Sequence, residues 1–159
     1  MQVASRTMEQ VNSHNPDAVF VDATGIGWGV IDRLNQLGCP NVRGVDFGSK
    51  ADRTDALDAA ARYANKRAEM WGFMKDWCKT GCLPDDQELI ADLKAVDYGY
   101  DTSDAILLER KDDMRRRGLA SPDDGDALAL TFAYPVAKRD WAEERRFEEG
   151  LQRLKRWVV

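Results

Sequence analysis

The chain has 159 residues, 43% of them hydrophobic, which is enough for one domain with a sizeable core. The net charge is −5 and no apolar run approaches the roughly 20 residues of a membrane helix, so a membrane protein and a uniformly basic nucleic-acid binder are both disfavoured. Three cysteines (Cys39, Cys78 and Cys82) without a secretory signal favour a reducing cytoplasm, and with His14 the only histidine a structural zinc site is not expected.

The hydrophobic periodicity predicts an α/β chain in which helices and strands alternate. The expected helices are residues 1–14, 27–37 and 56–77, two further helices that start near Pro84 and Pro122, and a charged helix over 138–159. The expected strands are residues 17–22, 41–47, 95–100 and 105–109, the last two joined as a hairpin by residues 101–104. Gly38 is expected to end the second helix, and Pro84 and Pro122 suit a first helical turn, where a missing N–H is tolerated.

Residues 119–132 open a helix with three acids and then become abruptly apolar. If Ser121 caps this helix and Pro122 takes its first turn, Asp123 and Asp126 lie on one face and their carboxylates can converge on a cation. Acids in a first turn also offset the helix dipole without any function. Asp126 favours the metal interpretation, because it leads directly into the apolar part and an acid placed there needs a partner.

Asp22 is a second candidate, because it closes the predicted strand 17–22 and ligands of open α/β sheets bind beyond the carboxyl ends of strands. The glycine-rich residues 22–29 are also similar to the strand-turn-helix of dinucleotide-binding and S-adenosylmethionine-dependent methyltransferase folds, with Asp46 near the expected place of a ribose-binding acid. The spacing is Gly-x-Gly-x-Gly rather than Gly-x-Gly-x-x-Gly, however, and that interpretation gives no role to Asp123 and Asp126.

Basic residues gather in three places despite the negative net charge: Lys66-Arg67, Arg110-Lys111 and Arg115–Arg117. Such groups either bind phosphate or are solvated helix faces. For the group around Lys111 we expect a function, because it precedes the acidic helix by a short turn, and Lys111 would counter the charge of a scissile phosphate.

Four blocks of the sequence resemble a known family in order and approximate spacing. The blocks are VFVDATGIG (19–27), YANKRAEMW (63–71), LERKDDMRRRG (108–118) and SPDDGDALALTFA (121–133), and the resemblance runs from about Met1 to Ala137. They resemble the C-terminal nuclease domain of the large terminase subunit of tailed bacteriophages. The resemblance implies an α/β, ribonuclease H-like mixed sheet flanked by helices, with a small auxiliary β-hairpin. It also implies that Asp22, Asp123 and Asp126 bind metal, by their positions in the blocks.

The function implied by this resemblance is a metal-dependent endonuclease that cuts concatemeric DNA during phage DNA packaging. Two Mg²⁺ or Mn²⁺ ions, roughly 3.5–4 Å apart, would activate a water and stabilise the leaving oxygen of the phosphodiester. Asp22, Asp123 and Asp126 are the expected catalytic metal ligands, Lys111 is the expected phosphate contact, and Asp124 points elsewhere on its helix. The implied partners are double-stranded DNA, the terminase ATPase domain, the small terminase subunit and the portal, in the host cytoplasm and without a membrane.

The start of the chain departs from the family's pattern. The family's domain begins with a β-hairpin whose first strand carries another catalytic aspartate, and no residue before Asp22 fits that strand. We therefore expect residues 1–137 to form a truncated nuclease domain and residues 138–159 a charged C-terminal helix. A non-catalytic DNA-binding or assembly fragment, and a dinucleotide- or S-adenosylmethionine-binding domain, stay open as alternatives.

Overall fold

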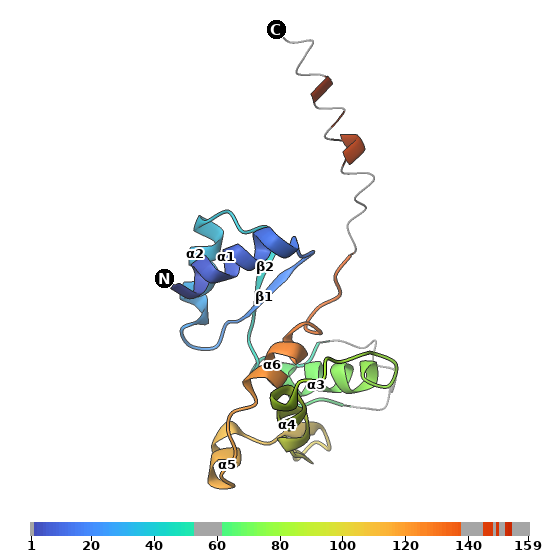
Figure 1. Ribbon diagram of the computed structural model, residues 1–159. Coiled ribbons are helices and arrows are strands. Elements are labelled where there is room, and N and C mark those ends of the chain that lie inside the picture. Colours follow the sequence, from blue (N-terminus) through green and yellow to red (C-terminus); the bar gives the residue numbers. More distant parts are fainter. Residues whose placement is uncertain (1, 53–61, 138–144, 148, 150–151, 154–159) are drawn as a thin grey trace.

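The structure is a computed structural model that describes residues 2–52, 62–137, 145–147, 149 and 152–153. It is an α/β chain of helices and two small sheets (Figure 1). The elements are α1 (Gln2–His14), β1 (Val19–Asp22), α2 (Gly27–Gln36), β2 (Val42–Val45), α3 (Lys66–Trp77), α4 (Gln87–Ala95), β3 (Tyr98–Tyr100), β4 (Ile106–Leu108), α5 (Lys111–Arg116) and α6 (Asp123–Leu130). Most of the expected elements are thereby confirmed, with shorter strands; α5 was not foreseen.

Strands β1 and β2 pair in parallel, with Val19 opposite Val42 and Asp22 opposite Val45. Helix α2 makes the crossover between them, as parallel pairing requires. Strands β3 and β4 form the expected antiparallel hairpin. Within the described residues these are two separate two-stranded sheets, so the coarse α/β class is confirmed, whereas a single mixed sheet is not seen there.

Two glycines set the limits of α2. Gly38 has φ +76°, the left-handed conformation that ends the helix as expected. A Cβ atom on Gly27 would lie 1.7 Å from the carbonyl oxygen of Asp22, so only glycine lets the start of α2 approach the end of β1 this closely. This close packing gives the glycine-rich segment a structural reason that needs no bound phosphate.

Two hydrophobic clusters hold the fold together, one on each side of β1. Val19 and Val21 pack against the cluster that includes Leu34 of α2 and the buried residues of α1. Phe20 points the other way and packs against the cluster of α3 and α6, which includes Met70. Because successive side chains of a strand alternate between its faces, this short strand joins the two helix groups seen in Figure 1.

Helix α3 begins later than the sequence indicated. Residues 53–61 lie outside the described part, but residues 62–65 are not helical: Tyr63 forms an isolated parallel bridge with Ile106. Asn65 then caps the helix, its side-chain oxygen accepting from the backbone N–H of Ala68 at 2.9 Å. The prediction that residues 62–65 are helical was wrong. Their backbone pairs with Ile106 of the hairpin, and the side chain of Asn65 accepts a hydrogen bond from a first-turn amide of α3.

The expected C-terminal helix lies mostly outside the described residues. Of residues 138–159, the structure describes 145–147, 149 and 152–153, which are helical. Across the described ranges, no helix combines the length and the hydropathy needed to cross a membrane.

Candidate active site

The first turn of α6 carries the acids that the sequence singled out, but Ser121 does not cap it. The capping position is held by Pro122, which offers no side-chain hydrogen bond. The Ser121 hydroxyl instead donates to Oδ1 of Asp123 at 2.6 Å. The expected serine cap was therefore wrong, because the hydroxyl is taken up by a carboxylate two residues later.

A residue from another helix caps α6. The backbone N–H groups of Asp124 and Gly125 donate to Oδ2 of Asp92 in α4, at 3.0 and 3.1 Å. A Cβ atom on Gly125 would lie 3.3 Å from the Cβ of Asp92, so the glycine helps α4 to come close enough. Asp92 thus satisfies two amides that a local side chain would usually satisfy.

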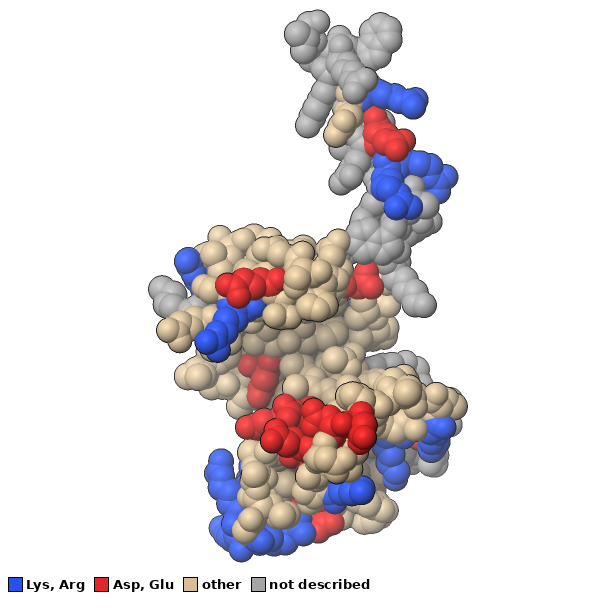
Figure 2. Space-filling model, viewed as in Figure 1, with Lys and Arg blue, Asp and Glu red and all other residues tan. Residues whose placement is uncertain are grey.

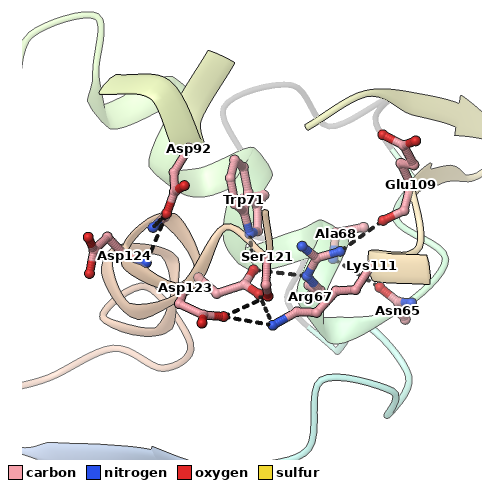
Figure 3. Close-up of polar contacts among 12 residues, drawn as sticks. Asn65, Arg67, Ala68, Trp71, Asp92, Glu109, Lys111, Ser121, Asp123 and Asp124 are labelled. Atoms are coloured by element: carbon pink, nitrogen blue, oxygen red, sulfur yellow. Dashed lines mark hydrogen bonds and ion pairs between the residues drawn. The ribbon is translucent and has the colours of Figure 1, made fainter. Parts of the chain in front are cut away.

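Asp126 is the centre of the site, buried with 5% of its surface exposed. Figure 3 shows the residues around it, among them Arg67, Trp71 and Lys111. Oδ1 of Asp126 accepts two hydrogen bonds from α3, from Nε of Arg67 and from Nε1 of Trp71, both at 2.9 Å. Its Oδ2 lies 2.9 Å from Nζ of Lys111. Oδ1 thus has both buried donors of α3, whereas Oδ2 is paired with Lys111, whose side chain is 37% exposed.

Lys111 joins the two acids. Its Nζ also lies 3.4 Å from Oδ1 of Asp123, whose side chain is 80% exposed. This shared contact confirms that Asp123 and Asp126 present their carboxylates on one face, and Figure 3 shows Asp124 directed away from Lys111. The hydrogen bond from the hydroxyl of Ser121 is the main reason that the pKa of Asp123 lies below its ordinary value. Burial opposes this shift, and the charge of Lys111 adds to it.

Asp22 lies at the carboxyl end of β1, as expected, and α6 packs against this strand. Its Oδ1 accepts from the backbone N–H of Thr24 at 2.8 Å, which fixes the turn that follows the strand. Within the described ranges no three His, Cys, Asp or Glu side chains stand close enough to hold a metal ion together. The structure therefore unites Asp123, Asp126 and Lys111, and the part of Asp22 as a ligand stays a proposal.

The basic group Lys66-Arg67 is not a phosphate-binding surface, which corrects that option. Lys66 is 1% exposed, and its Nζ contacts Oδ1 of Asp52 at 2.5 Å and Oε1 of Glu69 at 2.6 Å. Arg67 is 9% exposed and directed at Asp126. Both cations have carboxylate partners in the same chain. The sequence alone did not indicate these partners, because it shows only two positive charges at the start of a helix.

The other basic groups lie at the surface near α5. Figure 2 shows Lys and Arg side chains over α5, below a large acidic area over α4 and the start of α6. Arg115 and Arg116 pair with Asp112 and Asp113 one turn earlier, at 2.7 and 2.6 Å. Such exposed pairs contribute little to stability and can open for another anion.

Comparison with known proteins gives a consistent result for the fold. No family model and no curated protein sequence matches the chain. Among solved structures it is similar to the nuclease domain of the large terminase subunit gp2 of bacterial virus Sf6, with 17% identity and a TM-score of 0.64, over 84% of this chain and 72% of that chain. A lysine-to-alanine variant with manganese (17% identity, TM-score 0.65, 83% and 72%) and one with calcium (17%, 0.62, 83% and 71%) also match. This chain has the fold of a terminase nuclease domain.

Seen as a terminase nuclease fold, the site offers donor atoms that suit a hard divalent cation. The buried Oδ2 of Asp126 has no partner among the buried donors of α3, and Asp123 is largely exposed beside it. Carboxylate oxygens are the ligands that Mg²⁺, Mn²⁺ and Ca²⁺ prefer. Lys111 shares this position, so a cation bound there would compete with the lysine for the two carboxylates.

Three residues of this terminase nuclease fold were not recognised as parts of the site from the sequence: Arg67, Trp71 and Asp92. The first two fall in the block YANKRAEMW, where the sequence offers Arg67 only as part of a basic group and gives Trp71 no role. Asp92 carried no signal, because its function as a cap depends on the packing of α4 against α6.

Proposed function

We propose that this chain is a metal-dependent DNA endonuclease domain of a phage DNA-packaging terminase, with a ribonuclease H-like core, that cuts concatemeric double-stranded DNA. One observation carries the proposal. In the fold of a terminase nuclease domain, a buried aspartate at the start of α6 is held through one oxygen, and its other oxygen faces Lys111 beside Asp123.

Asp22, Asp123 and Asp126 are the residues that would hold Mg²⁺ or Mn²⁺. The chemistry that two such ions supply when bound is activation of a water molecule and stabilisation of the leaving oxygen of a phosphodiester. Asp126 contributes a fixed, buried oxygen, and Asp123 contributes an exposed one whose lowered pKa keeps it ionised. Asp22 would approach from the end of β1, against which α6 packs.

Lys111 is the residue that would contact the scissile phosphate. Its side chain is 37% exposed and its charge is shared between two carboxylates. Once those carboxylates bind cations, the flexible ammonium group is free to turn to a phosphate oxygen. The arginines of α5 extend the positive surface next to it.

The setting of the proposed enzyme follows from the same resemblance. We propose residues 1–137 as the nuclease domain and 138–159 as a charged C-terminal helix. The proposed partners are double-stranded DNA, the terminase ATPase domain, the small terminase subunit and the portal, in the host cytoplasm.

The test compares Asp126→Asn with Asp124→Asn in a calorimetric Mn²⁺ titration and in a plasmid cleavage assay. Asparagine keeps an oxygen for the N–H groups of Arg67 and Trp71, so we expect Asp126→Asn to fold and to lose Mn²⁺ binding and cleavage. Asp124 points away from Lys111, and its variant should behave as the unaltered protein. Retained cleavage in Asp126→Asn would contradict the assignment. DNA binding without Mn²⁺ binding in the unaltered protein would favour the non-catalytic alternative.

A further inference from the structure

We infer that Arg67 and Trp71 are positioning residues, which hold Asp126 so that one of its carboxylate oxygens is kept for a cation. This inference rests on the proposed function and deepens it. Neither residue is expected to touch the cation or the DNA, since both are buried and both donate to the carboxylate.

The two carboxylate oxygens of Asp126 have different partners, which is the first observation behind this inference. Both donors from α3 converge on Oδ1, at 2.9 Å each, and neither reaches Oδ2. A carboxylate held only for stability would gain by spreading these two buried donors over both oxygens, whereas here Oδ2 is left to an ion pair with Lys111, whose side chain is 37% exposed. Here two donors fix the plane of the carboxylate and aim Oδ2 at the side where Lys111 and Asp123 lie.

Arg67 also makes a second hydrogen bond, to a residue close to Lys111. Its Nη1 donates to the backbone carbonyl of Glu109 at 3.1 Å, two residues before Lys111. One guanidinium group therefore connects the acidic first turn of α6 with the segment that leads into α5 (Figure 3). A rigid, planar group with several donors suits this task, and lysine could not make both contacts in the same way.

Trp71 is fitted to the helix that it supports. A Cβ atom on Gly125 would lie 3.0 Å from the Trp71 ring, so the glycine before Asp126 makes room for the indole. The guanidinium of Arg67 lies over the same ring, 5.8 Å from its centre. The position of the ring thus fixes two donors to Asp126, the indole N–H of Trp71 itself and the neighbouring Nε–H of Arg67. Groups that orient a metal-binding side chain in this way commonly affect metal affinity by about 10- to 100-fold.

The decisive experiment is a calorimetric Mn²⁺ titration of Trp71→Phe beside Trp77→Phe, with urea unfolding to show that each variant is folded. Phenylalanine keeps an aromatic ring at position 71 and removes only the N–H donor and part of the ring. We expect Trp71→Phe to weaken Mn²⁺ binding about tenfold. Trp77 lies on the same helix and contacts Phe132, so its variant should bind Mn²⁺ with unchanged affinity.

A second measurement needs no variant at these positions and covers the case that Trp71→Phe fails to fold. In the unaltered protein with ¹⁵N-labelled tryptophan, added Mn²⁺ should broaden the indole N–H resonance of Trp71 strongly and that of Trp77 weakly. In Asp126→Asn the selective broadening should disappear.

The outcomes separate this inference from the function on which it rests. If the unaltered protein binds Mn²⁺ but Trp71→Phe binds it equally well, the positioning role is refuted and the nuclease proposal stands. If Mn²⁺ binds without selective broadening of the Trp71 resonance, the ion does not bind beside Asp126, and the proposed metal ligands fail together with the positioning role. If the unaltered protein binds no Mn²⁺, the metal-dependent function fails and the positioning role fails with it.

Discussion

Helix α3 begins with two charged clusters, each built around a buried cation and a buried carboxylate, that differ in one respect. The first, formed by Lys66, Glu69 and Asp52, is closed: the lysine contacts both carboxylates and lies 4.5 Å from the centre of the Tyr134 ring. The second, centred on Asp126, is open, because one carboxylate oxygen is paired with Lys111, whose side chain is 37% exposed, and not with a buried donor. Burial of charge therefore does not distinguish the two clusters, whereas the partly exposed lysine beside Asp126 does.

In the closed cluster, the two carboxylates stabilise the buried charge of Lys66. Burial alone lowers the pKa of Lys66, but the hydrogen bonds and charges of Asp52 and Glu69 outweigh it and raise the pKa above the ordinary lysine value. The carboxylate of Glu69 also accepts from the backbone N–H of Asp52 at 2.8 Å, which ties the loop after β2 to α3. This cluster is scaffold, and the open one is the candidate site.

Removing one partner of the closed cluster should have the largest effect on stability. Glu69→Ala removes the buried one of the two carboxylate partners of Lys66 and leaves only the half-exposed Asp52, so we expect the free energy of unfolding to fall by about 3 kcal/mol, measured by urea denaturation. The double variant Lys66→Met/Glu69→Leu should recover most of this loss, because no uncompensated charge remains. The Mn²⁺ affinity of the folded Glu69→Ala protein should not change, and a tenfold change would break the distinction between the two clusters.

The pH dependence of this effect has a definite sign. Because the pKa of Lys66 is raised in the folded protein, its stabilising contribution is complete below the ordinary lysine pKa and is lost as pH rises through the raised value. The difference in unfolding free energy between the unaltered protein and Glu69→Ala should therefore narrow at strongly alkaline pH.

In the open cluster, removal of the positive charge of Lys111 should strengthen metal binding. We expect Lys111→Gln to bind Mn²⁺ roughly tenfold more tightly in calorimetry, because a positive charge within 4 Å of both carboxylates no longer competes. Cleavage should nevertheless fall, since the phosphate contact is lost. Arg116→Gln, an exposed cation of the same helix that pairs with Asp113, is the matched control and should leave Mn²⁺ affinity unchanged. Weaker binding in Lys111→Gln would show that the lysine supports the site instead of competing for it.

The cap supplied by Asp92 should have a moderate effect. Asp92→Ala removes the acceptor of two first-turn amides of α6, and we expect the unfolding free energy to fall by about 1 kcal/mol. Glu88→Ala, an exposed acid one turn earlier in α4, should change it by less than about 0.5 kcal/mol. Equal losses in the two variants would mean that the cap does not stabilise the acidic turn.

The smallest predicted effect concerns Asp123. Ser121→Ala removes the hydrogen bond that contributes most to its lowered pKa, so the pKa should rise toward the ordinary aspartate value in a carboxyl NMR titration. A lowered pKa stabilises the fold above the unfolded-state pKa, and this contribution is lost as pH falls through the folded value. Asp101, whose pKa is lowered first by Ser103, serves as an internal control and should not move.

The elements and the acidic face were predictable because their signals are local. Alternation and periodicity in neighbouring residues indicated β1, α2, β2 and the hairpin, and the spacing of Asp123 and Asp126 placed them on one side of α6. The late start of α3 escaped prediction, since the backbone before it is engaged by β4, more than 40 positions further along the chain.

By itself, the sequence determined that Asp126 is an acid leading into an apolar helix, and therefore that it needs a partner. Only the tertiary structure decided which partners it has, because Arg67 and Trp71 lie 59 and 55 positions away and reach it only when α3 packs against α6. Lys66 is likewise buried only in the tertiary structure, beside Asp52 from the loop after β2 and the ring of Tyr134. Charge and periodicity can be read from neighbouring residues, whereas the partner of a buried charge depends on which distant segments pack together in the core.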